Sequence, residues 1–151
     1  MTAEREGDRT TSWASSPAVR SVMRANRRRD TRPELEVRRL VHAMGLRYLV
    51  DAAPIRASRR RADLVFRGPR VAVFIDGCFW HACPEHGMTP RTNTVFWSEK
   101  LRRNSERDAE TDRLLVEADW LPLRFWEHQD RAEVAAAVAD VVRRRRPMRD
   151  R

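Results

Sequence analysis

The sequence predicts an α/β fold in which helices cover both faces of one sheet. Helical and strand-like patterns follow one another in the order helix, hairpin, helix, strand and helix. One of the strands, at residues 71–75, is apolar at every position, which is typical of a central strand. The length of 151 residues allows one domain of ordinary size with a single core.

The first helix is predicted within residues 30–45. Thr31 is expected to act as its N-cap, and Glu34 three residues later completes a capping box. Pro33 is tolerated in the first turn, and Gly45 is expected to end the helix.

A hairpin is predicted next. Its strands at residues 62–66 and 71–75 are joined by a turn at residues 67–70, whose length suits a hairpin.

Three further elements complete the prediction: a long helix at about residues 94–118, a strand at 121–126, and a helix at 131–146 that ends before Pro147. The apolar residues of the two helices recur at the helical period. They are Phe96, Trp97, Leu101, Leu114 and Leu115 in the first, and Val134, Val138, Val141 and Val142 in the second.

The two ends of the chain differ from this domain in composition. Residues 1–18 lack apolar periodicity and are expected to form a flexible arm, and residues 147–151 a basic tail, which leaves the folded domain at 19–146. No uncharged apolar run approaches the roughly 18 residues of a membrane span, and the polar N-terminal residues exclude a secretory signal. A cytoplasmic protein with no membrane partner is expected.

The net charge favours a polyanionic partner such as nucleic acid. The chain has 31 basic and 22 acidic residues, a formal net charge of +9. Because Lys100 is the only lysine among the basic residues, GC-rich codon usage also explains part of the bias. The charge is therefore partial evidence.

Four carboxylates occupy positions where apolar residues are expected. Glu34 borders the apolar stripe of the first helix, and Asp108 lies about 20° from Trp97 on the long helix. Asp63 interrupts an apolar strand, and Asp76 ends the next one. Taken singly, each is explained by an arginine salt bridge, a cap or a strand-end turn. Four around one sheet favour a cation site, because Mg²⁺ requires hard oxygen ligands.

Acidic residues on two successive strands are similar to the metal-dependent nuclease core that restriction endonucleases share. That common plan has a lysine two positions after the second acid, where this chain has Cys78. The sequence therefore predicts a restriction-endonuclease-like three-layer α/β/α core with a central mixed sheet, in which another group must handle the proton.

Cys78, Cys83 and His86 fit three of four tetrahedral zinc ligands, and His128 is the natural fourth. Two cysteines and two histidines close the coordination shell, which indicates a structural zinc. The alternative is that two reduced cysteines are simply near each other. His81 lies between the ligands and is then free for general-base work near neutral pH.

Phe79 and Trp80 are large aromatics on the same loop, and Trp97 begins the long helix. Core packing explains most such residues. In a basic protein, aromatics on a rigid loop also act as wedges that enter a base step and unstack it.

Over residues 20–129 the sequence resembles the very short patch repair endonucleases, the Vsr family of bacterial nicking enzymes specific for T:G mismatches. The stretch at residues 24–39 is similar to the family's opening segment, and further motifs follow in the family's order. They are Ala62-Asp63-Leu64-Val65-Phe66, Gly77-Cys78-Phe79-Trp80-His81, Phe96-Trp97-Ser98-Glu99-Lys100, the stretch from Asn104 to Asp108, and Trp126-Glu127-His128.

The resemblance implies that Asp63 is the central Mg²⁺ ligand, aided by the main-chain carbonyl of Ile75. It also implies that Glu34 and Asp108 act through metal-bound water and that His81 is the catalytic histidine at the scissile phosphate. The wedge and zinc roles of the aromatic, cysteine and histidine residues named above follow from the same resemblance.

Three positions depart from the best-known members of that family. Asp76 and Cys83 stand where those members have histidine, and His128 stands where they have cysteine. The zinc substitutions exchange one good ligand for another. Asp76 places a carboxylate where those members have an imidazole near the phosphate. This carboxylate would either coordinate a metal or cap a turn, so its part in the catalytic site stays open.

The expected function is Mg²⁺-dependent nicking of duplex DNA 5′ to the thymine of a T:G mismatch, the product of 5-methylcytosine deamination, by a monomer. A first alternative is a restriction-type nuclease that cuts a sequence. A second is a zinc-stabilised DNA-binding module without catalysis, in which Arg59, Arg60 and Arg61 contact the backbone. Glu34 and Asp108 favour an enzyme, because a pure binder gains nothing from carboxylates near phosphates.

Overall fold

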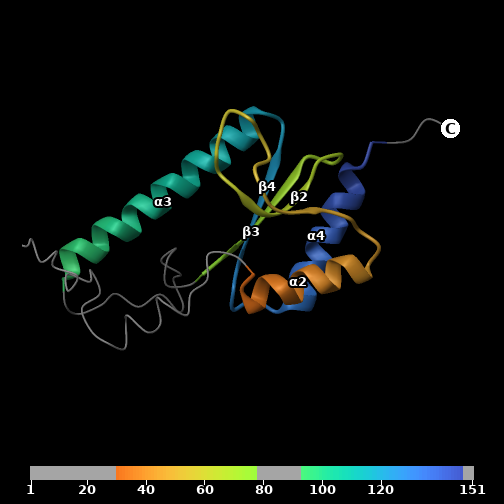
Figure 1. Cartoon of the computed structure of the whole chain (residues 1–151), viewed down its shortest axis with the longest axis horizontal. Coiled ribbons are helices and arrows are strands. Elements are labelled where there is room, and N and C mark those ends of the chain that lie inside the picture. Colours follow the sequence, from red (N-terminus) through yellow and green to blue (C-terminus); the bar gives the residue numbers. More distant parts are fainter. Residues whose placement is uncertain (1–29, 78–92, 148–151) are drawn as a thin grey trace, which may run out of the picture.

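The computed structural model describes residues 30–77 and 93–147 of the chain. Figure 1 shows the arrangement of the helices and strands in these ranges. Their bounds are α2 (Arg32–Ala43), β1 (Leu49–Ala52), β2 (Ala62–Phe66), β3 (Val71–Asp76), α3 (Thr94–Glu117), β4 (Leu121–Trp126) and α4 (Arg131–Arg145). The predicted arm at residues 1–18 and most of the predicted tail lie outside the described residues.

The strands form one mixed sheet in the order β1-β2-β3-β4. β1 pairs antiparallel with β2, β2 pairs antiparallel with β3, and β3 pairs parallel with β4. The predicted hairpin of β2 and β3 and the central place of β3 are therefore confirmed. The parallel register runs from Val71 opposite Leu121 to Asp76 opposite Trp126, so β3 and β4 end together.

Helices cover both faces of this sheet (Figure 1). On one face α2 and α4 pack against alternate residues of β2 and β3, and the core there includes Leu64, Val73 and Val138. On the other face Leu115 near the end of α3 packs in a second core with Trp120. Each fully buried Val or Leu stabilises the fold by roughly 1.5–3 kcal/mol. The predicted α/β class and the mixed sheet are confirmed.

The start of α2 follows the prediction only in part. Thr31 is the N-cap residue, but its side chain makes no capping hydrogen bond to the helix. The other half of the predicted capping box is present in modified form, because Glu34 accepts a hydrogen bond from the main-chain N–H of Asp30. Gly45 has a φ of 85°, the left-handed conformation that glycine adopts readily after a helix.

β1 is an element that the sequence pattern does not predict. It has four residues, Leu-Val-Asp-Ala, of which none is fully buried. Asp51 within it has a φ of 46°, which is unusual for a strand residue. Such a short edge strand depends on pairing with β2 rather than on its own periodicity, so the sequence carries little signal for it.

α3 is a 24-residue helix whose C-terminal part packs on the sheet. Figure 1 shows its N-terminal part extending well beyond the sheet. The predicted apolar stripe is buried at Trp97 and Leu115, whereas Phe96 remains 44% exposed. None of the helices in the described ranges has the length and apolar character that crossing a membrane would require.

Candidate functional site

Asp63 in β2 is the centre of the candidate site. Its Oδ2 atom accepts a hydrogen bond of 2.6 Å from the main-chain N–H of Ile75 in β3. Burial raises the pKa of Asp63 to about 7, and the neighbouring carboxylates of Glu34 and Asp76 also raise it, whereas the Ile75 N–H and Arg38 act in the opposite direction. The carboxyl group therefore lies in a desolvated region with an excess of negative charge.

Glu34 reaches this region from the first turn of α2. It is only 5% exposed. Its Oε2 atom accepts hydrogen bonds from the main-chain N–H of Asp30 at 2.9 Å and from Nη2 of Arg38 at 3.2 Å. Burial raises the pKa of Glu34, while the Thr31 hydroxyl, the Asp30 amide and Arg38 reduce that shift. The helix start thus fixes the position of this acid.

Asp76 closes β3 and is also buried, with 8% of its surface exposed. Nη1 of Arg124 donates to its two carboxylate oxygens at 3.1 and 3.2 Å. Its main-chain oxygen accepts a hydrogen bond from the N–H of Glu127 at 2.9 Å, just after β4. Asp76 is therefore held by groups from the neighbouring parallel strand and its extension.

Asp108 joins the site from α3, and its prediction on the sheet-facing side of the helix agrees with its half-buried position. Its Oδ1 atom lies 3.7 Å from Nη1 of Arg124. One turn later, Asp112 accepts two hydrogen bonds of 2.9 Å from Nε of the same arginine. Asp108 and Asp76 are thus both close to the guanidinium group of Arg124.

Sequence reasoning missed Arg124 and Arg38. Both are arginines in a chain rich in arginine, and although Arg38 lies within the family-like stretch at residues 24–39, its residue type does not separate it from the surface arginines around it. The one available signal is that Arg124 interrupts the strand at residues 121–126. Such a position predicts a buried cation only when its acidic partners on other elements are known.

The donor set suits Mg²⁺ in its chemistry, since these side chains offer carboxylate oxygens. Within residues 30–77 and 93–147, no three acidic or histidine side chains are grouped closely enough to hold a metal ion by themselves. Glu34 and Asp76 each bind an arginine, whereas Asp63 is hydrogen bonded to a main-chain amide. This arrangement is compatible with one direct carboxylate ligand, Asp63, and with more distant roles for the other acids.

The predicted loop residues cannot be placed in the same way. Cys78, Phe79, Trp80, His81, Cys83 and His86 all lie outside the described residues. Of the predicted zinc ligands only His128 is described, two residues after the end of β4. β3 and β4 are parallel and end together. His128 follows β4 at this end of the sheet, and in the sequence Cys78 follows β3 at the same end.

Trp97, predicted to be part of the wedge, has none of its surface exposed. It makes an edge-to-face contact with the ring of Phe96, with centroids 5.3 Å apart. In this structure the indole is therefore inaccessible to a base step, and its role as a wedge remains a prediction.

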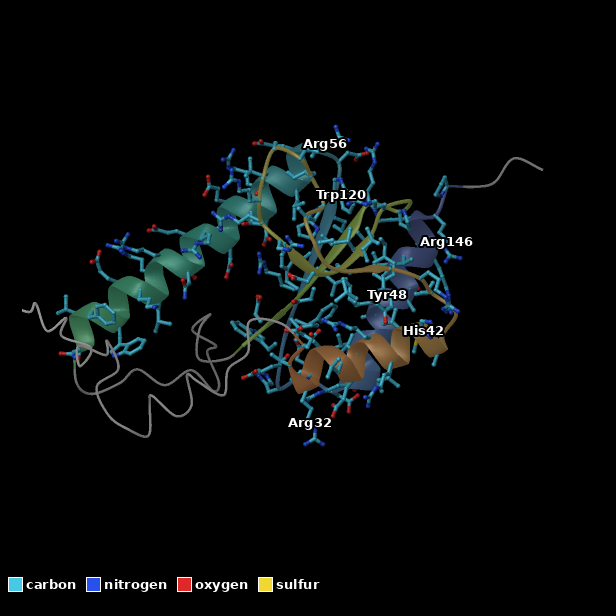
Figure 2. All side chains as sticks on the ribbon, viewed as in Figure 1. Arg32, His42, Tyr48, Arg56, Trp120 and Arg146 are labelled. Atoms are coloured by element: carbon cyan, nitrogen blue, oxygen red, sulfur yellow. The ribbon has the colours of Figure 1, made fainter. Side chains whose placement is uncertain are left out.

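The three arginines expected to contact the DNA backbone lie in the segment before β2. Arg60 is 3.5 Å from Glu110 of α3, and Arg61 is 3.4 Å from Asp51 of β1. Figure 2 shows many further charged side chains on the outside of the protein, including Arg32 and Arg146, which both point away from it. Within residues 30–77 and 93–147, arginines thus lie on several elements rather than in one segment.

Comparison with protein families identifies one that covers part of the candidate site. Residues 14–85 match the family described as "DNA mismatch endonuclease Vsr". This stretch contains Glu34, Asp63 and Asp76 together with the predicted loop residues up to Cys83.

Individual relatives extend the similarity to most of the chain. A type II nicking enzyme of Lentzea aerocolonigenes, V.NaeI, is 46% identical over 123 residues, which cover 80% of this chain and 74% of the relative. The type II nicking enzyme V.NmeDIP of Neisseria meningitidis serogroup C is 38% identical over 112 residues, or 72% and 73% of the two chains. The DNA mismatch endonuclease Vsr of Escherichia coli strain K12 is 37% identical over 109 residues, or 70% and 66%.

Proposed function

Because the chain belongs to the Vsr family of DNA nicking endonucleases, which are phosphodiester hydrolases, we propose that its substrate is duplex DNA with a T:G mismatch. It would nick one strand 5′ to the thymine. A T:G mismatch arises when 5-methylcytosine loses its amino group, so this activity would initiate very short patch repair.

The observation that carries the proposal is the environment of Asp63. Its carboxyl group lies beside Glu34 and Asp76, and its burial, together with these neighbouring carboxylates, raises its pKa to about 7. A divalent cation would stabilise the ionised form of such a carboxyl group. In a site that only bound phosphate, the negative charge of this group would repel the phosphate and weaken its binding. Asp63 would hold Mg²⁺, which when bound supplies Lewis acidity for the attacking water and charge neutralisation at the phosphate.

The chain's own groups divide the remaining tasks. Glu34, fixed by Arg38 and the Asp30 amide, and Asp108 would orient water near Asp63. His81 would take or relay the proton from the attacking water. Cys78, Cys83, His86 and His128 would hold a structural Zn²⁺, and Phe79, Trp80 and Trp97 would separate the bases at the mismatch.

A second candidate is a nuclease that nicks at a defined sequence in fully paired DNA. It is favoured by the names of two of the relatives, which are described as type II nicking enzymes. A DNA-binding module without catalysis has no comparable support, since it offers no reason for the buried Asp63 and Glu34.

The deciding experiment uses end-labelled duplexes that differ only in one base pair, T:G in the substrate and T:A in the control. The flanking sequences should be varied in parallel, because the required context is part of the question. We expect Mg²⁺-dependent nicking of the thymine strand in the T:G duplex alone. Equal nicking of both duplexes at one sequence would support the second candidate, and binding of DNA without any nicking would refute both.

A further inference from the structure

Arg124 lies at the meeting point of three acidic side chains. In the parallel register it stands opposite Phe74 of β3, so both side chains point to the face of the sheet that α3 covers. The guanidinium carbon is 4.2 Å from the centroid of the Phe74 ring. This stacking fixes the plane of the guanidinium group while leaving its N–H groups available to acceptors.

The N–H groups of Arg124 point to carboxylates on two different elements. Nη1 is 3.1 Å from Oδ1 of Asp76 in β3 and 3.7 Å from Oδ1 of Asp108 in α3. Nη2 also donates to the main-chain oxygen of Asp108 at 3.4 Å. Nε and Nη2 lie 2.9 Å from oxygens of Asp112. The planar fork of one arginine therefore fixes three acids relative to one another.

This cluster differs from the ion pairs on the protein surface. The Arg124 side chain is 21% exposed and that of Asp76 is 11% exposed, so the pair is largely removed from water. A pair such as Arg113 with Glu117 on α3 is more than half exposed at both partners. Exposed pairs of that kind contribute little, whereas removing one partner of a largely buried pair leaves an uncompensated charge.

The location of the cluster connects it with the candidate active site. Asp76 belongs to the acidic neighbourhood of Asp63, and Asp108 has a predicted place in the same site. The close contacts between Arg124 and Asp112 are sufficient to attach α3 to β4. Arg124 also donates to Asp76 at the end of β3, next to Ile75, whose N–H is hydrogen bonded to Asp63.

We infer that Arg124 is a positioning residue of the nicking reaction, whose guanidinium holds the carboxylate of Asp76, a neighbour of Asp63, beside that of Asp108. The inference rests on the proposed nuclease function. Arg124 acts through the two acids and is not assigned a contact with DNA. A lysine has one compact ammonium group in place of the planar fork, and so is expected to replace the charge but not the geometry.

The test compares three variants of the full chain: Arg124→Met, Arg124→Lys and the control Arg113→Met, which removes an arginine of an exposed pair on α3. Single-turnover nicking rates and DNA dissociation constants are measured below the unfolding temperature of each variant. We expect Arg124→Met to reduce the rate about 10²-fold, the scale of a small misplacement of reacting groups, with less than a threefold change in DNA affinity. Arg124→Lys should recover thermal stability more than rate, and Arg113→Met should retain the wild-type rate.

A double-mutant cycle with Asp76→Asn separates positioning from stability. If Arg124 acts through Asp76, the rate of Arg124→Met combined with Asp76→Asn should be close to that of the slower single variant. The inference would be overturned if the rate loss of the double variant equalled the product of the two single losses. A wild-type rate in any folded variant of Arg124 or Asp76 would also overturn it. If Arg124→Met does not fold, Arg124→Lys carries the same test.

The variant Asp63→Asn distinguishes failure of this inference from failure of the proposed function. An inactive Asp63→Asn together with an active Arg124→Met would leave the nuclease in place and remove the role of Arg124. An active Asp63→Asn would instead refute the assignment of the nuclease site.

Discussion

The carboxylate of Asp63 in β2 and the main-chain N–H of Ile75 in β3 are joined by a hydrogen bond of 2.6 Å. The register pairs of these two antiparallel strands run from Phe66 opposite Val71 to Leu64 opposite Val73. The bond from Asp63 therefore connects the strands just beyond their last register pair. The central acid of the site is thus fixed where the backbone pairing stops, with Glu34 and Asp76 as neighbours.

The first prediction concerns the dependence of stability on pH. The pKa of Asp63 is about 7 in the folded protein, against an ordinary value of 3.8. As the pH rises from about 4 to about 7, the unfolded chain loses this proton first, so the free energy of unfolding falls. Thermal unfolding measured without added Mg²⁺ should show this decrease in the free energy of unfolding between about pH 4 and about pH 7. In Asp63→Asn the decrease over the same pH range should be smaller, by up to a few kcal/mol. Parallel curves for the two proteins would contradict the raised pKa.

The second prediction concerns the metal role of Asp63. At pH 8, added Mg²⁺ should raise the unfolding temperature of the wild type, because a ligand that binds only the folded state stabilises it. Asp63→Asn should lose this response and the nicking activity, while its affinity for a T:G duplex stays within about threefold, since phosphate contacts dominate affinity. Nicking by this variant in Mg²⁺ at a substantial rate would refute the assignment.

The third prediction assigns proton transfer to His81. His81→Ala should lower the nicking rate by about 10²-fold or more, the usual scale of general acid–base catalysis. His42→Ala is the matched control, because His42 is exposed near the C-terminal end of α2. Equal rates for His81→Ala and the wild type would leave His81 without a catalytic role.

The fourth prediction is one Zn²⁺ per chain, held by Cys78, Cys83, His86 and His128. Elemental analysis of protein purified without chelators should find one equivalent. Removing it should cost folded structure as well as activity, because binding of a structural zinc contributes to folding. Replacement of Cys78 by serine should lower the zinc content well below one equivalent. A zinc-free preparation with full activity would refute the site.

The fifth prediction concerns how the mismatch is recognised. Trp80→Ala should weaken binding to a T:G duplex by about 1–3 kcal/mol, the scale of one base–aromatic stack. Binding to paired DNA should change far less, because it depends on arginine–phosphate contacts and salt. Trp97→Ala supplies a second comparison, since Trp97 is fully buried here. If Trp80→Ala weakens both duplexes equally, the aromatics serve packing rather than recognition.

Local patterns in the sequence were sufficient to predict most elements of the fold. The helix at α2 carries its own start and stop residues in Thr31, Glu34 and Gly45, and β3 is apolar at every position before its last residue, Asp76. β1 was missed because a four-residue edge strand is stabilised by its partner strand rather than by its own pattern.

The candidate site was only partly predictable, for a related reason. The burial of Glu34 and the half-buried position of Asp108 follow from helical periodicity, which reports the side of a helix that faces the sheet. The contact of Arg124 with Asp76 joins residues 48 positions apart on parallel strands. No local pattern records such a pair, and composition hides it further, because arginine is so common in this chain.

The mixed sheet also has a consequence for the order in which the protein acquires its site. β1, β2 and β3 follow one another and pair antiparallel, so they require only short-range loop closure once synthesised. β4 pairs with β3 only after a long intervening stretch, and contacts of this kind form late in folding. On the ribosome, Asp63 and Asp76 would leave the exit tunnel well before Arg124. A nascent chain would therefore contain the acids of the nuclease without their organising cation, and activity would begin only when the last strand docks.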